Sequence, residues 1–406
     1  MRFTIILLLL FLFDFYFYKS TSISKMYANS NIISIIYWSI CLLIYFFIFY
    51  VFFNSNNILD KDQINFTVIN SLIMIWIISR FFGSLLLFTD DIFRLFKYII
   101  NLFLFNTEYS TSRLEFLKKS ALAVSGILAG SLLLGMKFGR YNFKKHYLNI
   151  KISRWNSELN NYKIIHISDL HLGSFQSTDK LEEVVELINI ENADLIVFTG
   201  DLVNNYFYEA LPYVKILKKL KAKDGKFSIL GNHDYGDYTA HRRSSQEWKD
   251  NFKNMINTHK NIGFNLLLNE STIISSVRGS FNLIGVENWG KGEFNKDGDL
   301  LKATSKISKD LPNILLSHDP SHWSEQVTDH SDFIDLQLSG HTHGMQFGVE
   351  IADIKWSPIK FRYKEWAGLY KKNNHQIYVN RGLGHLGYAG RVGIMPDISV
   401  LNIKSI

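Results

Sequence analysis

The chain has 406 residues, of which 47% are hydrophobic and only 20% are charged, so it is neither an intrinsically disordered nor a fibrous protein. Its single cysteine excludes a disulfide framework and any zinc site built from several thiolates. The net charge of +7 would by itself point to nucleic acid or a membrane surface as a partner. The length allows two or three domains.

The composition changes sharply near residue 140. Residues 1–140 contain all the long apolar runs and carry 12 Lys or Arg against 7 Asp or Glu, whereas residues 141–406 carry 32 against 30. Most of the positive excess therefore belongs to the apolar part. We expect a transmembrane region over residues 1–140, a linker over 141–159 and a soluble domain over 160–406.

The apolar runs predict an α-helical transmembrane region, because about 20 mainly apolar residues are enough to cross a bilayer. We expect about four spans, near residues 3–18, 31–53, 66–88 and 120–137. The first run lacks a small-residue cleavage site, which favours a retained anchor over a cleaved signal peptide. A further stretch, 92–105, places Arg94, Lys97 and Asn101 on one helical face, which favours a helix lying at the membrane surface.

Two ionisable residues, Asp14 and Arg80, lie inside the apolar runs. Such groups are functional candidates, but we favour the interpretation that they reach the interface or pair with each other. The positive-inside rule does not decide the orientation, because the loops on the two sides carry nearly equal numbers of Lys and Arg. The run Ser112-Arg113-Leu114-Glu115-Phe116-Leu117-Lys118 resembles a twin-arginine export signal without its second arginine. It favours a bacterial cell-membrane protein whose soluble domain is extracytoplasmic.

From residue 141 onward the pattern alternates between apolar strands and amphipathic helices, which predicts an α/β sandwich. The expected strands are 163–167, 195–198, 227–230, three short ones between 264 and 288, then 314–316, 336–338, 376–379 and 398–403. The expected helices include 181–188, 208–220 and 241–259.

Polar side chains follow five of these strands. The five strings are Ser168-Asp169-Leu170-His171, Gly200-Asp201, Gly231-Asn232-His233-Asp234, Ser317-His318-Asp319 and Gly340-His341-Thr342-His343-Gly344. The carboxyl ends of strands are where open α/β sheets form their ligand crevice. Carboxylate, imidazole and amide donors together favour Mn, Fe, Zn or Co over Ca. One string alone could be a turn or a packed histidine, but five in order indicate a metal site.

These strings, together with IIHISDLHLGSF, GHTHGMQFG and YVNRGLG, resemble the calcineurin-like metallophosphoesterase family, most of all its bacterial membrane-associated branch. The resemblance covers roughly residues 160–406 and implies a four-layer α-β-β-α sandwich around two metal ions. It implies a ligand set of Asp169, His171 and His343 for the first metal, Asn232, His318 and His341 for the second, and Asp201 bridging both. The family has a second glycine after the last histidine pair where this chain has Met345, so the local turn or pocket rim should differ.

The resemblance also assigns a catalytic pair, with His233 as the catalytic histidine and Asp234 orienting its ring. Two metals about 3.5–4 Å apart would activate a shared water for attack on phosphorus, and His233 would protonate the leaving alkoxide. We further expect Arg381 and His385 in the closing glycine-rich loop to contact the substrate phosphate, and Asp319 to support His318.

The predicted function is that of a membrane-anchored, metal-dependent phosphoric ester hydrolase acting on phosphomonoester, phosphodiester or pyrophosphate bonds. Anchoring would place the crevice near membrane lipids, so phospholipids or a nucleotide-linked lipid such as UDP-diacylglucosamine are candidate phosphoester substrates. A nuclease or nucleotide phosphodiesterase of the same fold is the alternative, although the near-neutral soluble half argues against a nucleic-acid partner. A third interpretation is a membrane sensor without catalytic activity. We also expect no obligate protein partner.

Overall fold

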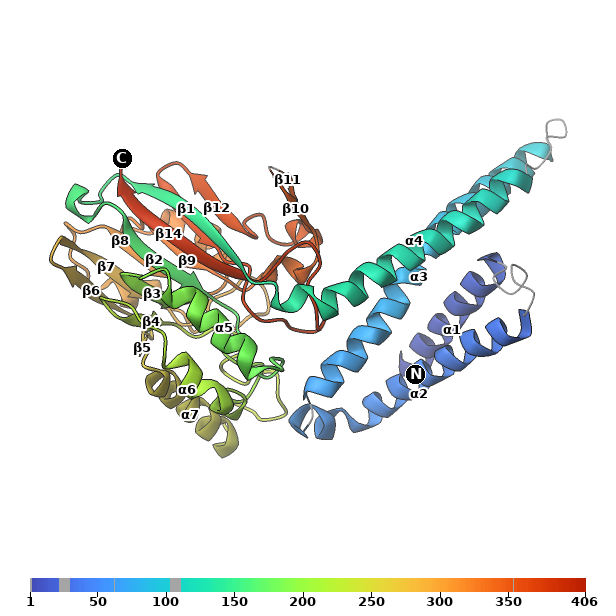
Figure 1. The fold of residues 1–406 in the computed structure, drawn as a ribbon, viewed down its shortest axis with the longest axis horizontal. Coiled ribbons are helices and arrows are strands. Elements are labelled where there is room, and N and C mark those ends of the chain that lie inside the picture. The colour runs from blue at the N-terminus through green and yellow to red at the C-terminus, as the bar shows by residue number, and fades with distance from the viewer. Residues whose placement is uncertain (1, 22–29, 62, 103–110, 353) are drawn as a thin grey trace. The chain divides into compact units, whose positions relative to one another are not determined.

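The computed structural model describes residues 2–21, 30–61, 63–102, 111–352 and 354–406 (Figure 1). The chain forms two compact units, residues 1–134 and residues 135–406. The first unit is built from long apolar helices, and the second contains all the strands that the structure describes.

Four helices occupy the apolar region: α1 (Arg2–Thr21), α2 (Ser30–Lys61), α3 (Gln63–Asn101) and α4 (Thr111–Lys137), whose last residues belong to the second unit. Within the described residues, three segments are long and apolar enough to cross a membrane: Asn31–Phe53, Asn65–Asn101 and Ser112–Tyr141. The spans predicted at 31–53, 66–88 and 120–137 fall inside these three. The run predicted at 3–18 is helical, in α1, but is not among them.

The helix that we expected at the membrane surface, 92–105, is not a separate element. Its described residues continue α3 without interruption to Asn101, and residues 103–105 lie outside the described part of the chain. One of the two cations that argued for an interfacial position is neutralised within the same helix, because Arg94 pairs with Asp91 and, at 3.1 Å, with Asp90. Since paired charges at i,i+3 and i,i+4 support a helix, this polar stretch does not end α3.

Asp14 and Arg80 pair with each other. This pairing was one of the two structural interpretations that the sequence allowed, the other being that both side chains reach the membrane interface. The Arg80 guanidinium contacts the Asp14 carboxylate, and both side chains are at most 5% exposed. Tyr45 donates a further hydrogen bond to this carboxylate, and the guanidinium carbon lies 4.0 Å from the centre of the Trp76 ring. The pair therefore links α1, α2 and α3 through a satisfied polar cluster rather than exposing a charge to hydrocarbon.

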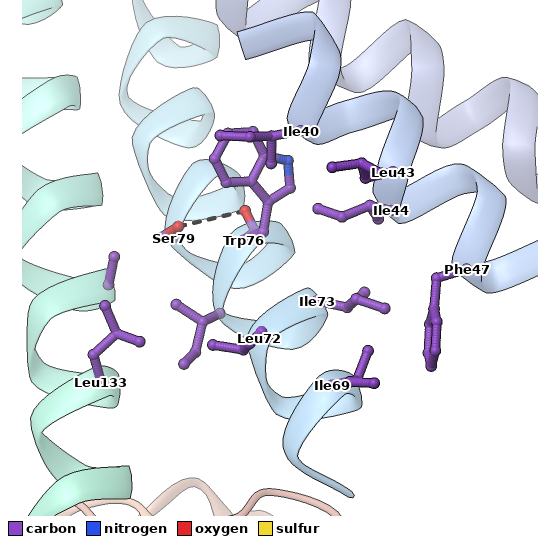
Figure 2. A pocket seen from close by; sticks show the side chains of 12 residues that line it. Ile40, Leu43, Ile44, Phe47, Ile69, Leu72, Ile73, Trp76, Ser79 and Leu133 are labelled. Carbon is purple, nitrogen blue, oxygen red and sulfur yellow. Dashed lines mark hydrogen bonds between the residues drawn. The ribbon is translucent and has the colours of Figure 1, made fainter. Parts of the chain in front are cut away.

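An apolar groove of about 570 Å³ lies between α2, α3 and α4 (Figure 2). Phe47, Ile73 and Leu133 are typical of its lining, and Ser79 contributes a hydroxyl group. Figure 2 shows these side chains converging from three helices onto one space. Such a surface is suited to hydrocarbon rather than water, which agrees with a position inside a membrane.

The second unit contains two six-stranded mixed sheets and a separate hairpin. The first sheet has the order β1 (Lys144–Ile152), β14 (Asp397–Ser405), β2 (Tyr162–Ile167), β3 (Leu195–Phe198), β4 (Lys226–Ser228) and β5 (Asn265–Leu266). The second has the order β12 (Gly368–Lys372), β13 (His375–Val379), β9 (Leu336–Ser339), β8 (Asn313–Leu316), β7 (Gly279–Gly285) and β6 (Glu270–Ser276). The hairpin is β10 (Val349–Ile351) with β11 (Ile354–Trp356).

The sheets and helices form four layers, which confirms the predicted α-β-β-α sandwich. Fully buried side chains of both sheets, such as Leu195 and Leu336, share one core, so the sheets pack face to face. The other face of the first sheet packs against α5 (Thr178–Asn189), α6 (Val214–Leu217) and α7 (Gln246–Ile262), and that of the second sheet against α8 (Leu300–Thr304) and α9 (Ser321–Glu325). Alternate residues of each strand thus face two different cores, and the strands read as nearly continuous apolar runs.

Two expectations about secondary structure were wrong. The linker expected over 141–159 contains β1, which pairs in parallel with β14 over its whole length. Its charged residues hid the strand, because β1 lies at the edge of the sheet and every second side chain faces outward. The helix expected over 208–220 is reduced to two 3₁₀ turns and the single turn of α6, since Pro212 interrupts it.

Candidate metal centre

The polar strings predicted from the sequence meet at one edge of the sandwich. Parallel strands β2, β3 and β4 in one sheet and β8 and β9 in the other end next to these strings. The carboxyl ends of parallel strands share one edge of a sheet, and face-to-face packing brings the two edges together. Asp169 and His341 show this directly, because the backbone N–H of His341 donates to the Asp169 carboxylate at 3.0 Å across the two sheets.

The ligand loops have an unusual backbone. Asp169, His171, Asp201, His341 and His343 all have φ between +47° and +71°, a region that Asp, Asn and His tolerate better than most residues. Long-range hydrogen bonds impose this conformation, for example from the N–H of Asp169 to the Gly200 carbonyl at 2.9 Å. Backbone strain that tertiary structure holds in place is a common property of functional sites.

Close contact between the loops also requires glycine at Gly340. A Cβ atom at this position would lie 2.0 Å from Ser168 Oγ and 2.2 Å from Asp169 Oδ2. No side chain can fit there without displacing the Asp169 carboxylate. The glycine that precedes the histidine pair therefore allows the two ligand loops to approach each other.

The first group of donors combines Asp169, His171, Asp201 and His343, whose ligand atoms all lie within 4.8 Å of one another. Nε2 of His171 lies 3.1 Å from Nε2 of His343, and His343 Nε2 lies 3.1 Å from Asp169 Oδ1. Two imidazole nitrogens facing each other across this distance, with carboxylates beside them, fit a shared cation.

The second group combines Asp201, His318 and His341, and Asn232 joins it. Asn232 Oδ1 lies 3.1 Å from His318 Nε2 and 2.9 Å from His341 Nδ1. Asp201 belongs to both groups, since its Oδ2 lies 3.5 Å from His171 Nε2 and 3.2 Å from His318 Nε2. The two groups have the composition that the family resemblance implied, with one carboxylate between them.

Partners on the far side of the histidine rings orient several of these donors. The Nδ1–H of His318 donates to the Thr199 carbonyl at 2.7 Å, and Nδ1 of His171 bonds Asn204 Oδ1 at 3.1 Å. In both rings this leaves Nε2 with its lone pair facing the donor group, as metal ligation requires. Asn204 lies in the loop after β3, 33 residues from His171 in the sequence. The sequence analysis did not identify this contact.

The ring of His341 is held by Asp319 and Tyr363. Its Nε2 lies 2.8 Å from the Tyr363 hydroxyl and 3.3 Å from Asp319 Oδ2, while its Nδ1 faces the donor group. We had expected Asp319 to support His318, and it supports His341 instead. Tyr363 lies outside the five strings, so only the fold could identify it.

Electrostatics reinforce the pairing between Asp201 and His318. Burial alone would lower the pKa of His318, but the Asp201 carboxylate outweighs this effect and raises it to about 10. Burial would likewise raise the pKa of Asp201, but the His318 and His233 imidazoles hold it well below its ordinary value.

The predicted catalytic pair is arranged differently from our expectation. His233 is half-buried beside the first donor group, with its ring centre 5.0 Å from that of His171. Its Nδ1 bonds the Asn204 carbonyl at 2.8 Å, so a backbone group, rather than Asp234, orients the ring. This bond leaves Nε2 as the ring nitrogen that Asn204 does not hold.

Asp234 instead holds the loop that carries Asp201. Its two carboxylate oxygens accept four backbone N–H groups, from Gly231, Asp201, Leu202 and Val203, at 2.7 to 3.3 Å. Burial and the nearby charge of Asp201 raise the pKa of Asp234 to about 7, while these N–H donors act in the opposite direction. A residue with this role positions a candidate ligand and does not touch the ring of His233.

The two residues expected to contact substrate phosphate are buried. The Arg381 guanidinium is bound by Glu350, at 2.5 and 2.9 Å, and by Asp397 at 2.9 Å. His385 is 1% exposed, and burial lowers its pKa to about 3, so it is a neutral ring inside the closing loop. Neither placement supports direct contact with a substrate. Met345 lies in a left-handed turn with Gly344 and Gln346, at φ +56°.

The fold and the paired donor groups define the class of a metal-dependent hydrolase. A sequence profile described as calcineurin-like phosphoesterase matches residues 162–345. A second, the 4TM phosphoesterase profile described as "Probable Calcineurin-like phosphoesterase, transmembrane domain", matches residues 1–140. The chain therefore carries both a phosphoesterase domain and a transmembrane region.

Relatives agree with this assignment. The chain is 32% identical to "Uncharacterized metallophosphoesterase YkuE" of Bacillus subtilis, over 72% of this chain and 98% of that protein. It is 28% identical to "Transmembrane protein with metallophosphoesterase domain" of Danio rerio, over 63% of this chain and 56% of that protein. It is 27% identical to "Phosphodiesterase YaeI" of Escherichia coli, over 60% of this chain and 82% of that protein. The chain belongs to the calcineurin-like phosphoesterase family.

Proposed function

We propose that this protein is a membrane-anchored phosphoesterase that uses two metal ions, drawn from Mn, Fe, Zn and Co, to hydrolyse phosphomonoester, phosphodiester or pyrophosphate bonds. The observation that carries the proposal is the pair of donor groups that share Asp201 and lie beside His233. When bound, the metal ions supply Lewis acidity toward the phosphate oxygens and an activated water.

The residues of the chain have separate tasks in this proposal. The carboxylates and imidazoles around Asp201 would hold the cations, and all of these candidate ligands except the partly exposed His341 are buried. His233 acts as the proton donor in this proposal. Because the Asn204 carbonyl holds its Nδ1–H, Nε2 is the atom that would deliver a proton to the departing oxygen.

The substrate is proposed from the location of the enzyme. Three helices long and apolar enough to cross a membrane keep the catalytic domain close to lipid headgroups, so phospholipids or nucleotide-linked lipids are the substrates that we propose. The placement in a bacterial cell membrane with an extracytoplasmic catalytic domain is part of the same proposal. The near-neutral charge of residues 141–406 offers little attraction for a long polyanion, which disfavours a nuclease.

The test uses the full-length protein in detergent, loaded with Mn and supplied in turn with bis-p-nitrophenyl phosphate, mixed phospholipid micelles and an oligonucleotide. We expect hydrolysis of the first two substrates, and Asp201→Asn should abolish both activities. Asp310→Asn, at an exposed turn, is the matched control and should leave them unchanged. Equal activity of Asp201→Asn and the wild type would contradict the catalytic proposal, whereas cleavage of the oligonucleotide alone would contradict the lipid substrate only.

A further inference from the structure

Several exposed apolar side chains lie on the β10–β11 hairpin and on the 3₁₀ turn that follows it, Pro358–Phe361. We call residues 345–364 the hairpin segment. Phe361 is 80% exposed, Ile351 70% and Ile354 68%, and Met345, Val349 and Trp356 are also exposed. The hairpin forms a small sheet of its own beside the two large ones (Figure 1). Exposed apolar side chains concentrated in one short segment mark an interaction surface.

The same segment is basic. Residues 354–364 contain Lys355, Lys360, Arg362 and Lys364 and no acidic residue. The Lys360 ammonium lies 5.4 Å from the centre of the Phe361 ring and 6.0 Å from that of Trp356. Cations next to exposed aromatic and aliphatic groups are typical of segments that lie in the interface of an anionic bilayer.

One carboxylate of the hairpin segment, that of Glu350, does not offset this charge at the surface. Glu350, in β10, is paired with Arg381 at 2.5 and 2.9 Å. This ion pair fixes the start of the hairpin to the closing loop of the domain, since Arg381 also binds the buried Asp397. The hairpin is therefore an anchored projection with a cationic and apolar exterior.

The position of the hairpin segment within the second unit also favours a membrane. Its base pairs with residue 392, through the N–H of Val392 to the Gln346 carbonyl at 2.8 Å and the N–H of Gly348 to the Val392 carbonyl at 2.9 Å. The end of α4 packs on the same loop, where the N–H of Arg391 donates to the Gly135 carbonyl at 3.2 Å. Gly135 belongs to the candidate span Ser112–Tyr141. The hairpin thus stands beside the point at which the chain leaves the apolar helix.

We propose that the hairpin segment is a membrane-contact surface. Ile351, Ile354 and Phe361 enter the boundary between headgroups and acyl chains, and Lys360 and Lys364 bind anionic headgroups. The contact is independent of which phosphoester the enzyme cleaves. The hairpin segment is also hydrogen-bonded to the loop of the candidate metal centre. The Ser357 hydroxyl donates to the carbonyl of Gly344, the residue after His343, at 2.8 Å.

The experiment places an environment-sensitive dye on single cysteines in the full chain, reconstituted in vesicles of phosphatidylcholine with or without phosphatidylglycerol. The labelled variants are Ile354→Cys and Phe361→Cys, in a Cys41→Ala background. The matched control is Val277→Cys, because Val277 is a fully exposed aliphatic residue at the turn between β6 and β7, at the opposite edge of the second sheet from β12. Thermal unfolding of each variant verifies that the domain is folded.

We expect the dyes at 354 and 361 to shift their emission to the blue and to lose intensity when the lipids carry a quencher near the headgroup, whereas the dye at 277 does neither. Phosphatidylglycerol should enhance the effect, and Lys360→Gln with Lys364→Gln should remove that enhancement. Equal behaviour of the three dyes would overturn the proposal. Energy transfer between labelled chains without quenching by lipid would identify a second copy of this chain as the occupant, and would overturn it as well.

Discussion

Replacing Asp234 by asparagine tests the role that the structure gives this residue. The carboxylate accepts four backbone N–H groups, whereas an amide offers one oxygen and turns an N–H₂ group toward the other donors. If the amide oxygen stays with Leu202 and Val203, the bonds from Gly231 and Asp201 are lost. A hydrogen bond to a charged group contributes about 1.5–3 kcal/mol, so we expect Asp234→Asn to lower the free energy of unfolding by about 3–6 kcal/mol.

Thermal unfolding of the detergent-solubilised protein measures this loss. One kcal/mol lowers the midpoint by about 2–4 °C in a large domain, so the midpoint should fall by roughly 6–24 °C. Because the released loop carries Asp201, the Mn concentration needed for half-maximal hydrolysis should also rise, by about 10–100-fold. Asp310→Asn controls for the loss of one carboxylate.

The reasoning fails if Asp234→Asn unfolds within about 2 °C of the wild type and changes only the pH dependence of hydrolysis. That result would mean that Asp234 acts on the protonation of His233, as the family resemblance implied. A large loss of stability together with recovery of hydrolysis at high Mn concentration would support the positioning role instead.

Three further predictions concern other parts of the chain. Asn204→Ala removes the oxygen that holds Nδ1 of His171, so metal affinity measured by titration should fall by about 10–100-fold. His259 is buried, and burial lowers its pKa to about 3. Because the unfolded chain binds this proton near pH 6.5, stability against urea should fall as the pH drops below 6.5, by up to about 1.4 kcal/mol per pH unit. His259→Leu should flatten this slope. Asp14→Asn leaves Arg80 buried without its counter-charge and should cost about 3–5 kcal/mol in thermal unfolding, whereas Asp14→Leu with Arg80→Met should recover most of the loss.

The strand ends could be predicted because their signal is local. Each ligand string follows a short apolar run directly, and the ends of parallel strands meet by geometry alone, so Asp169, Asp201 and His318 could be placed at one edge without knowing the fold in detail. The alternation of strands and helices predicted an α/β sandwich in the same way, whereas its four layers were implied by the family resemblance.

What the sequence did not reveal depends on contacts between distant residues. The charged β1 became a strand only because β14, more than 240 residues later, supplies its partner. Tyr363 reaches His341 only after the hairpin segment has returned the chain to the site. Asp234 and Arg381 were assigned to the chemistry by motif, but their actual partners are backbone N–H groups and carboxylates of other loops. A motif identifies the type of residue that is present and does not specify the atoms that it meets.

The order of strands in the first sheet has a consequence for the synthesis of this protein. Strand β14 lies between β1 and β2, so the edge strand that follows the last apolar helix has no neighbour until residues 397–405 have been made. A ribosome produces the apolar helices first, and they can enter the membrane while the hydrolase domain is still incomplete. Until then β1 and β2 lack the strand that joins them in this sheet. A release of the chain before residue 397 would leave a tethered but open sheet, exposed to proteases and chaperones at the membrane surface.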